Sequence, residues 1–96
     1  MGKYKLTNRA ENEIEDIYEY SILNYGTDTA REYVSGLHEK FEVLADNQSW
    51  GNDYAFIKSG LCRIECRSHS IYYQSSGSGI LIVRVLGNRQ DPARHF

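Results

Sequence analysis

Hydrophobic and polar residues change their spacing twice along this chain of 96 residues. Residues 3–6 alternate between the two kinds, which predicts a short strand with Tyr4 and Leu6 directed inward. Apolar residues then recur at three- and four-residue intervals up to residue 44, as they do in amphipathic helices. From residue 54 onward the interval falls back to two. The pattern therefore predicts a strand, a helical region and a final group of strands.

The helical region divides into two helices at Gly26. The first helix is expected to begin after Thr7 or Asn8, and its apolar stripe consists of Ala10, Ile14, Ile17, Tyr18, Ile22 and Tyr25. The second is expected to be capped by Thr27 or Asp28, and its stripe consists of Ala30, Tyr33, Val34, Leu37, Phe41 and Leu44. Because only a few residues connect them, the helices should form an antiparallel hairpin.

The last part of the chain is predicted to form four strands joined by short turns. The first three are expected at residues 54–58, 61–67 and 70–74. Ser59-Gly60 has the composition of a two-residue hairpin turn between the first two of these strands. Residues 80–86, which read ILIVRVL, form a nearly continuous apolar run, and such a run is typical of a strand covered on both faces.

Together these elements predict one α+β domain that spans residues 1–96. The expected architecture is a two-layer sandwich of an N-terminal strand, an antiparallel helical hairpin and a four-stranded antiparallel meander, with the helices on one face of the sheet. If each connection reverses direction, the first strand runs parallel to the last and can pair with it. Trp50 follows the second helix and is expected to fold over the end of the hairpin; an exposed recognition residue is the alternative.

Charge is divided unevenly between the two halves, although the net charge is only −2. Residues 1–46 contain ten Asp and Glu and five Lys and Arg, whereas residues 47–96 contain three and six. This asymmetry suggests one face for a polar or anionic partner, but not direct nucleic-acid binding, which needs a basic domain. Because no apolar run approaches the roughly 20 residues of a membrane span and the N-terminus lacks a signal-peptide core, we expect a soluble cytoplasmic protein.

Cysteines and histidines do not show the spacing of a metal site, so we expect neither a metal nor a cofactor. Cys62 and Cys66 should share a strand face with Ile64 as reduced core residues. The sequence also contains no Ser-His-Asp order, no glycine-rich phosphate loop and no paired carboxylates on the predicted sheet. His95, near the C-terminus, is the only late acid–base candidate.

Arginines dominate the basic half of the chain. They are predicted on the sheet face away from the helices and on a cationic tail at residues 87–96, at positions Arg63, Arg67, Arg84, Arg89 and Arg94. Because a guanidinium presents a fork of donors, one interpretation is a groove that recognises carboxylates or phosphates. The alternative is a solvated sheet face on which Glu65 is a local partner.

In its ordered set of residues the chain resembles the ParE branch of the RelE/ParE toxin superfamily over nearly its whole length. In the first strand and helix the matching residues are Tyr4-Lys5-Leu6-Thr7, Ala10, Ile14, Asp16-Ile17 and Tyr20. In the second helix they are Gly26, Ala30, Tyr33, Leu37, Phe41 and Leu44-Ala45. In the sheet and tail they are Gly51, Gly60, Arg63, His69, Ile71-Tyr72-Tyr73, Ile82-Val83-Arg84-Val85-Leu86, Arg89, Asp91 and His95. The chain departs from the pattern at Gln48, Gly87 and Gln90, where relatives often carry Pro, His and Met.

This resemblance implies the RelE/ParE fold and the toxin of a type II toxin–antitoxin system, held in a hetero-oligomer by a ParD-like antitoxin. It implies inhibition of DNA gyrase, through its A subunit, rather than catalysis. The residues expected to contact the antitoxin are Arg63, Arg67, Ile80, Ile82 and Arg84. Those expected to contact the target are Arg89, Arg94, His95 and Phe96.

Two alternatives follow from the same resemblance. One is a ribosome-dependent messenger RNA endoribonuclease like RelE, in which Arg63, Arg84 and Arg89 hold the phosphate and His95 acts as the acid or base. The other is a non-toxic, partner-binding domain of the same fold.

Overall fold

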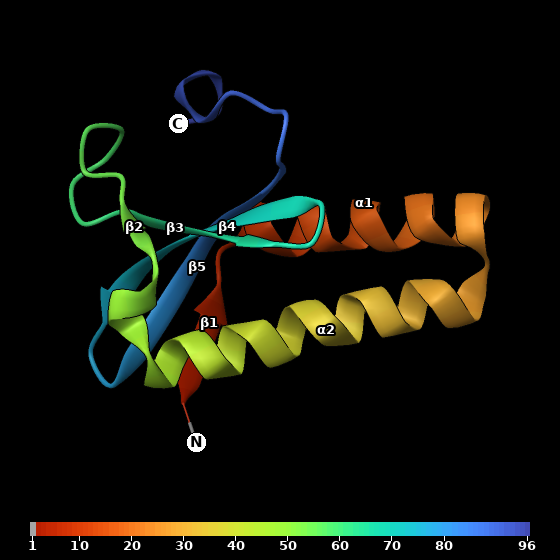
Figure 1. Cartoon of the computed structure of the whole chain (residues 1–96), viewed down its shortest axis with the longest axis horizontal. Helices are drawn as coiled ribbons and strands as arrows, with labels where there is room; N and C mark the ends of the chain where they lie inside the picture. Colours follow the sequence, from red (N-terminus) through yellow and green to blue (C-terminus); the bar gives the residue numbers. More distant parts are fainter. Residues whose placement is uncertain (1) are drawn as a thin grey trace.

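Helices and strands follow one another in the order that the hydrophobic pattern predicts (Figure 1). The computed structural model describes residues 2–96. The N-terminal part consists of β1 (Lys3–Leu6), α1 (Asn8–Tyr25) and α2 (Thr27–Asp46). The C-terminal part consists of the 3-10 turn η1 (Gln48–Trp50), β2 (Asn52–Asp53), β3 (Cys62–Cys66), β4 (His69–Ser76), β5 (Gly79–Gly87) and the 3-10 turn η2 (Pro92–Arg94).

The five strands form one sheet in the order β1-β5-β4-β3-β2. β2 to β5 are an antiparallel meander, and β1 pairs in parallel with β5, from Lys3 opposite Gly79 to Leu6 opposite Ile82. The parallel pairing of the first and last strands is therefore confirmed. Gly79 is required where the two strands begin, because a Cβ atom there would clash with the backbone carbonyl of Lys3.

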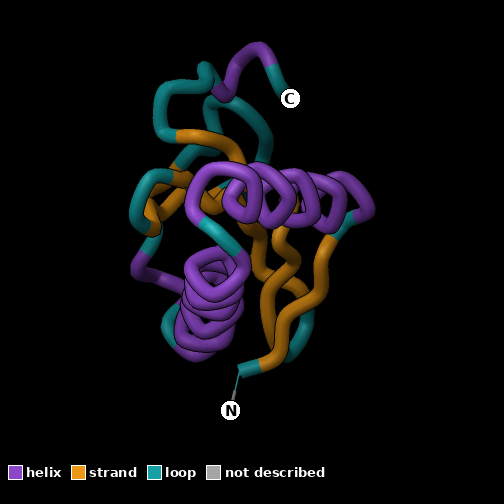
Figure 2. The backbone as a smooth tube through the Cα atoms, turned by 90° about the vertical axis from the view of Figure 1, so that its right-hand side faces the viewer, coloured by secondary structure: helices purple, strands orange, loops and turns teal. Residues whose placement is uncertain are grey.

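Both helices pack on one side of the sheet, which confirms the two-layer α+β sandwich (Figure 2). The core between the layers contains the buried apolar side chains of both helices and of β4 and β5: Ala10, Ile14, Leu37, Phe41, Leu44, Ala45, Ile71, Tyr73, Ile80, Ile82 and Val85. A smaller cluster of Leu61, Tyr72, Val83 and Leu86 covers part of the opposite sheet face. This second cluster explains why β5 is apolar on both faces.

The cap expected for the first helix is confirmed, whereas that expected for the second is wrong. Thr7 is the N-cap of α1, and its hydroxyl accepts a hydrogen bond from the backbone N–H of Ala10. Gly26 ends α1 and also stands at the N-cap of α2, so neither Thr27 nor Asp28 caps the second helix. Its φ of +91° lies in the region that favours glycine, and it reverses the chain between the helices without a longer loop.

The strand expected at residues 54–58 is not formed. The sheet keeps only Asn52 and Asp53 as β2, and the following residues make tight turns in which Ile57 and Lys58 both donate to the carbonyl of Tyr54. Tyr54 and Ile57, three residues apart, pack together on the smaller apolar cluster, whereas Phe56 is 77% exposed. The alternation of apolar residues in this stretch therefore does not indicate a strand, because the apolar residues that pack together, Tyr54 and Ile57, are three apart, as in a turn.

A β-bulge interrupts the pairing of β4 with β5. Tyr72 lies opposite Arg84 and Tyr73 lies opposite Ile82, so Val83 is the extra residue. After the bulge Val85 points into the core under the helices, and Arg84 shares the opposite face with Tyr72. A regular strand would have placed the Arg84 side chain under the helices instead.

Candidate functional site

Arg84 forms an ion pair with Glu13 of α1, seventy-one residues away in sequence. Its Nε and Nη2 atoms donate to Oε2 of Glu13 at 3.0 and 2.7 Å. The guanidinium reaches the helix past the end of β1, where β5 has no neighbouring strand. Only 10% of the Arg84 side chain and 19% of the Glu13 side chain are exposed, so water screens this pair weakly.

Glu13 also closes part of the free edge of β5. Its second oxygen, Oε1, accepts the backbone N–H of Val85 at 2.9 Å. On the same edge the hydroxyl of Thr7 donates to the carbonyl of Val83 at 2.7 Å, and the side-chain oxygen of Gln90 accepts the N–H of Gly87 at 2.6 Å. Side chains thus replace the strand that is missing beyond Leu6. Gly87 and Gln90, two of the positions that depart from the family pattern, are in contact here.

The C-terminal tail folds back over the Arg84 side of the sheet. Arg84 Nη1 donates to the backbone carbonyl of His95, and the Phe96 ring lies 5.8 Å from the guanidinium carbon of Arg84 and 5.3 Å from the ring of Tyr72. At its start the tail is held by Asn88, whose N–H donates to the carbonyl of Ser68 at 3.0 Å. Arg84 therefore joins helix, sheet and tail.

Arg63 lies on the sheet face away from the helices, as expected, but its guanidinium already has protein partners. Nη2 lies 3.1 Å from Oε1 of Glu65 and 2.7 Å from the hydroxyl of Ser70, and the guanidinium packs over the ring of Tyr54. The expected local pair with Glu65 is present. Burial opposes the charged guanidinium, but the hydrogen bonds to Glu65 and Tyr72 favour it, and the net effect raises the pKa of Arg63.

Arg67 is not on the face that was predicted for it. It stands in the turn between β3 and β4 with a φ of +59°, and its guanidinium lies over the ring of Tyr33 of α2 at 5.4 Å. A methyl group at Gly36 would lie 3.2 Å from Nη2 of Arg67, so the arginine packs closely on this helix. The strand ends at Cys66, and strand alternation therefore does not determine where Arg67 points.

The other expected contact residues lie in two different environments. Ile80 and Ile82 are 1% and 0% exposed and pack in the core under the helices, and Ile80 also borders a hollow beside β1 and the β4–β5 turn. Arg89 and Arg94 are exposed on the tail. The five arginines consequently do not form one continuous groove, because Arg67 faces α2 and Arg84 is occupied by Glu13.

Both cysteines are free and half-buried on the strand face that was predicted for them. Cys62, Ile64 and Cys66 all pack against the core under the helices. Burial, with a smaller contribution from Asp53, raises the pKa of the Cys62 thiol, which disfavours the reactive thiolate. Trp50, by contrast, is 56% exposed, with the ammonium of Lys40 lying 6.0 Å from its ring, so it does not fold down over the hairpin.

His69, the first residue of β4, contacts α2. Its Nδ1 atom lies 2.5 Å from the phenolic oxygen of Tyr33, which is also 2.9 Å from the hydroxyl of Ser68. Burial lowers the pKa of the imidazole. This contact was not predicted, because the β3–β4 turn and the middle of α2 are brought together only in the folded chain.

The lowered pKa of His69 predicts a pH dependence of stability. Below an ordinary histidine pKa of about 6.5 the unfolded chain binds a proton that the folded chain resists, so stability should fall as the pH is lowered through that value. His69→Asn, whose amide can still meet Tyr33, should lack this part of the decrease. Urea denaturation at about pH 7.5 and about pH 5.5 measures the loss of stability with pH for the unmodified chain and for His69→Asn. An equal loss in the two proteins would contradict the expectation.

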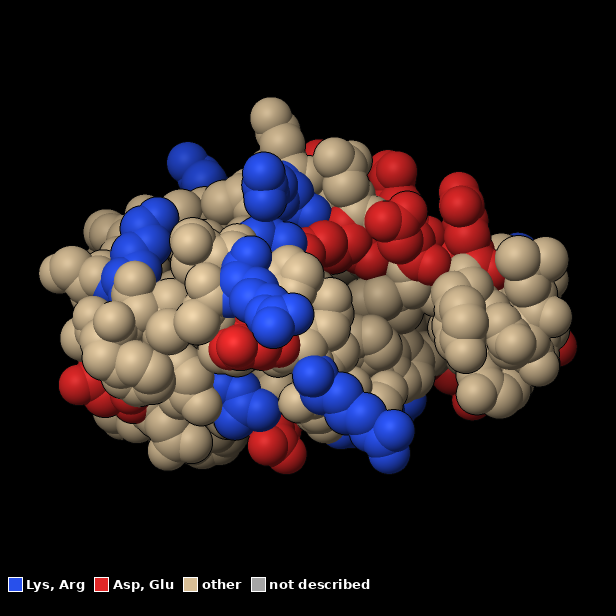
Figure 3. Space-filling view, turned by 90° about the horizontal axis from the view of Figure 1, so that it is seen from above, with Lys and Arg blue, Asp and Glu red and all other residues tan. Residues whose placement is uncertain are grey.

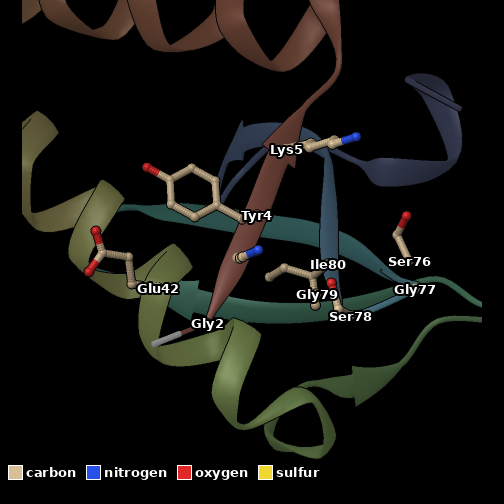
Figure 4. Close-up of a pocket in the computed structure, with 10 residues that line it drawn as sticks. Gly2, Tyr4, Lys5, Glu42, Ser76, Gly77, Ser78, Gly79 and Ile80 are labelled. Atoms are coloured by element: carbon tan, nitrogen blue, oxygen red, sulfur yellow. The ribbon is translucent and has the colours of Figure 1, made fainter.

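A cavity of about 630 Å³ lies beside β1 and the β4–β5 turn (Figure 4). Tyr4 and Glu42 lie on one side of β1, whereas Lys5 points to the other. Tyr4 is already hydrogen-bonded to Nδ1 of His38 at 2.7 Å. Because its polar groups diverge rather than converge, this cavity does not have the arrangement of a catalytic or small-molecule site.

Charges are separated on the surface as the sequence predicts. In the view from above, acidic side chains gather along α1, whereas basic ones are scattered over the other half with a few acidic ones among them (Figure 3). Within residues 2–96, no group of three or more His, Cys, Asp or Glu side chains is placed to hold a metal ion. Across the same residues, neither helix combines the length and the apolar character needed to cross a membrane.

Comparison with known proteins agrees with this fold and with the sequence resemblance. The family model described as "ParE toxin of type II toxin-antitoxin system, parDE" matches residues 4–92. The chain is 28% identical to Toxin ParE1 of Caulobacter vibrioides over 96 residues, which cover 100% of this chain and 99% of that protein. It is 29% identical to Toxin ParE1 of Mycobacterium tuberculosis over 96 residues, covering 99% and 98% of the two chains.

A solved structure shares the fold. It is titled "Chromosomal ParDE TA system from P. aeruginosa" and superposes with a TM-score of 0.75 at 22% identity, covering 91% of this chain and 96% of that one. The family match spans both helices and, apart from Lys3, all five strands. The chain therefore belongs to the ParE toxin family of type II toxin–antitoxin systems.

Proposed function

We propose that this toxin inhibits DNA gyrase without catalysing a reaction, and that a ParD-like antitoxin neutralises it. The absence of catalysis is supported mainly by the contacts of Arg84, whose guanidinium is already bonded within the chain. A ribonuclease needs free cationic groups at the scissile phosphate. Here Glu13 and the carbonyl of His95 take donors from all three guanidinium nitrogens of Arg84.

The structure also gives little support for His95 as the general acid or base of a ribonuclease. His95 stands next to the C-terminal residue, and its backbone rather than its ring meets Arg84. The ring Nε2 atom lies 3.5 Å from the side-chain nitrogen of Gln90. Arg63, the second candidate for holding a phosphate, is engaged by Glu65 and Ser70. Of the three arginines that would hold the phosphate in that alternative, Arg63 and Arg84 are therefore engaged within the chain, and Arg89 is exposed.

Target contact is assigned to the tail. Arg89 and Arg94 are exposed cations of the tail, and Phe96 of the same tail keeps 39% of its surface exposed. Arginine and aromatic residues are the types that are enriched in protein-binding hot spots. Antitoxin contact is assigned to the exposed Arg67 and the half-buried Arg63, whose guanidinium groups suit an acidic segment. The side chain of Asn88, at the start of the tail, donates to the backbone carbonyl of Arg67 at 2.9 Å, so this surface adjoins the tail. Ile80 and Ile82 are buried in the core and Arg84 is paired with Glu13, so these three residues are left out of the proposed antitoxin surface.

Two purified assays with the full chain test the proposal. In a DNA gyrase supercoiling assay, added toxin should block supercoiling, and an equimolar ParD-like antitoxin should restore it. In a ribosome assay with messenger RNA, the same preparation should leave the messenger intact. Messenger cleavage that is lost in His95→Ala would instead establish the ribonuclease, and inactivity in both assays would support a non-toxic binding domain.

A further inference from the structure

A cleft of about 410 Å³ opens between α1 and α2 near the free end of the helical hairpin. Tyrosines dominate its walls: Tyr20 and Tyr25 come from α1, and Tyr33 comes from α2. Ser68 and His69, from the start of β4 and the turn before it, also line it. Neither Arg84 nor any residue of the tail belongs to this cleft, so it is distinct from the site proposed for the target.

Asp16 is the one carboxylate that lines the cleft. Across residues 2–96 the salt bridges are Arg63–Glu65 and Arg84–Glu13, so Asp16 has no ion-pair partner among the described residues. The cleft holds no lysine or arginine, and burial lowers the pKa of His69, which keeps the imidazole neutral at pH 7. The cleft is therefore lined by aromatic rings and by one carboxylate that has no ion-pair partner among the described residues, and the nearby guanidinium of Arg67 lies over the ring of Tyr33.

We propose that this cleft receives an arginine side chain of a partner protein, with the guanidinium held by the carboxylate of Asp16 and packed against the rings of Tyr20 and Tyr25. These two tyrosines are 61% and 66% exposed, so both rings have surface left to cover an incoming side chain. The three residues assigned to the guanidinium belong to neither the gyrase nor the antitoxin proposal, although Arg67, assigned to the antitoxin, lies over Tyr33 at the wall of the same cleft.

The chain itself shows that tyrosine rings of this fold accept guanidinium groups. Arg67 lies over Tyr33 at 5.4 Å and Arg63 lies over Tyr54 at 5.7 Å. Cation–π contact and a bidentate carboxylate are the two features that favour arginine over lysine, whose ammonium lacks the planar fork. An anionic ligand would be repelled by Asp16, and a purely apolar side chain would cover the carboxylate without pairing it.

Titration of the full chain with Nα-acetyl-arginine methylamide, followed by two-dimensional 15N NMR, tests the assignment. We expect shifts confined to amides around Asp16, Tyr20 and His69, and no comparable shifts with the citrulline analogue, which has the same shape without the charge. Asp16→Asn should weaken binding about fivefold, as expected for one partly solvated ion pair. Tyr20→Ala should weaken it by a similar factor.

Glu19→Gln is the matched control, because Glu19 is an exposed carboxylate of the same helix that does not line the cleft. It should bind the arginine compound like the unmodified chain. Equal loss in Glu19→Gln and Asp16→Asn would show that only the general acidity of α1 attracts the probe. Equal shifts with the citrulline analogue, or no shifts at the cleft, would overturn the proposal outright.

Discussion

Glu13→Ala is expected to lower the free energy of unfolding by about 3 kcal/mol, a large fraction of the stability of a small domain. The substitution leaves the buried guanidinium of Arg84 without its carboxylate and the N–H of Val85 without an acceptor. Water cannot replace either lost partner well, because Arg84 as a whole residue is only 8% exposed. Urea denaturation followed by circular dichroism measures the effect.

Three further variants separate the possible causes of this loss. Glu15→Ala removes an exposed carboxylate two residues further along α1, and it should change stability by less than about 0.5 kcal/mol. Glu13→Gln keeps an acceptor for Val85 but loses the charge, so it should fall between the other two. Glu13→Leu combined with Arg84→Leu should recover part of the loss, because no charge is left unpaired. Equal stability of Glu13→Ala and Glu15→Ala would contradict a structural role for the pair.

Truncation after Gly87 is expected to abolish both growth inhibition and gyrase inhibition while leaving antitoxin binding largely intact. The deletion also removes Phe96 from Tyr72 and Gln90 from the N–H of Gly87, however, so it changes the fold as well as the proposed target surface. The double variant Arg89→Ala/Arg94→Ala is sharper, because both side chains are exposed. It should reduce gyrase inhibition about tenfold or more and should change stability by less than about 0.5 kcal/mol.

The matched control for the tail is Lys3→Ala/Lys5→Ala. It removes the same amount of positive charge from exposed positions on β1, outside the tail. Inhibition of supercoiling should remain unchanged in this variant. If both double variants lose inhibition equally, net charge rather than the tail drives the encounter, and the assignment of Arg89 and Arg94 to the target is wrong.

Elements with strong periodicity could be predicted from the sequence, and weakly patterned ones could not. The helical stripes predicted α1 and α2 because many residues at helical spacing support each of them. The stretch from Tyr54 to Lys58 has only five residues, and its apolar side chains suit a turn as well as a strand. Its conformation is decided by packing of Tyr54 and Ile57 on the far side of the sheet, which no local pattern contains.

At the candidate site, residue types were easier to predict than partners. Arg84 was singled out because a charge in an apolar run needs a partner, yet Glu13 was one of several acidic residues on α1. A useful signal was the position of Glu13 beside Ile14, at the border of the apolar stripe and next to the core. The bulge at Val83 then decides which face Arg84 takes, and a one-residue shift of this kind leaves no mark in a run of β-branched residues.

The sheet order β1-β5-β4-β3-β2 has a consequence for how the protein is made. β5 supplies Ile80, Ile82 and Val85 to the core and separates β1 from the other strands, yet it is the last strand to be synthesised. Until it is available, β1 has no neighbour in the sheet and the helical hairpin lacks the centre of the surface that it covers. Native closure must therefore wait until nearly the whole chain has been translated, which makes folding slow for a domain of this size.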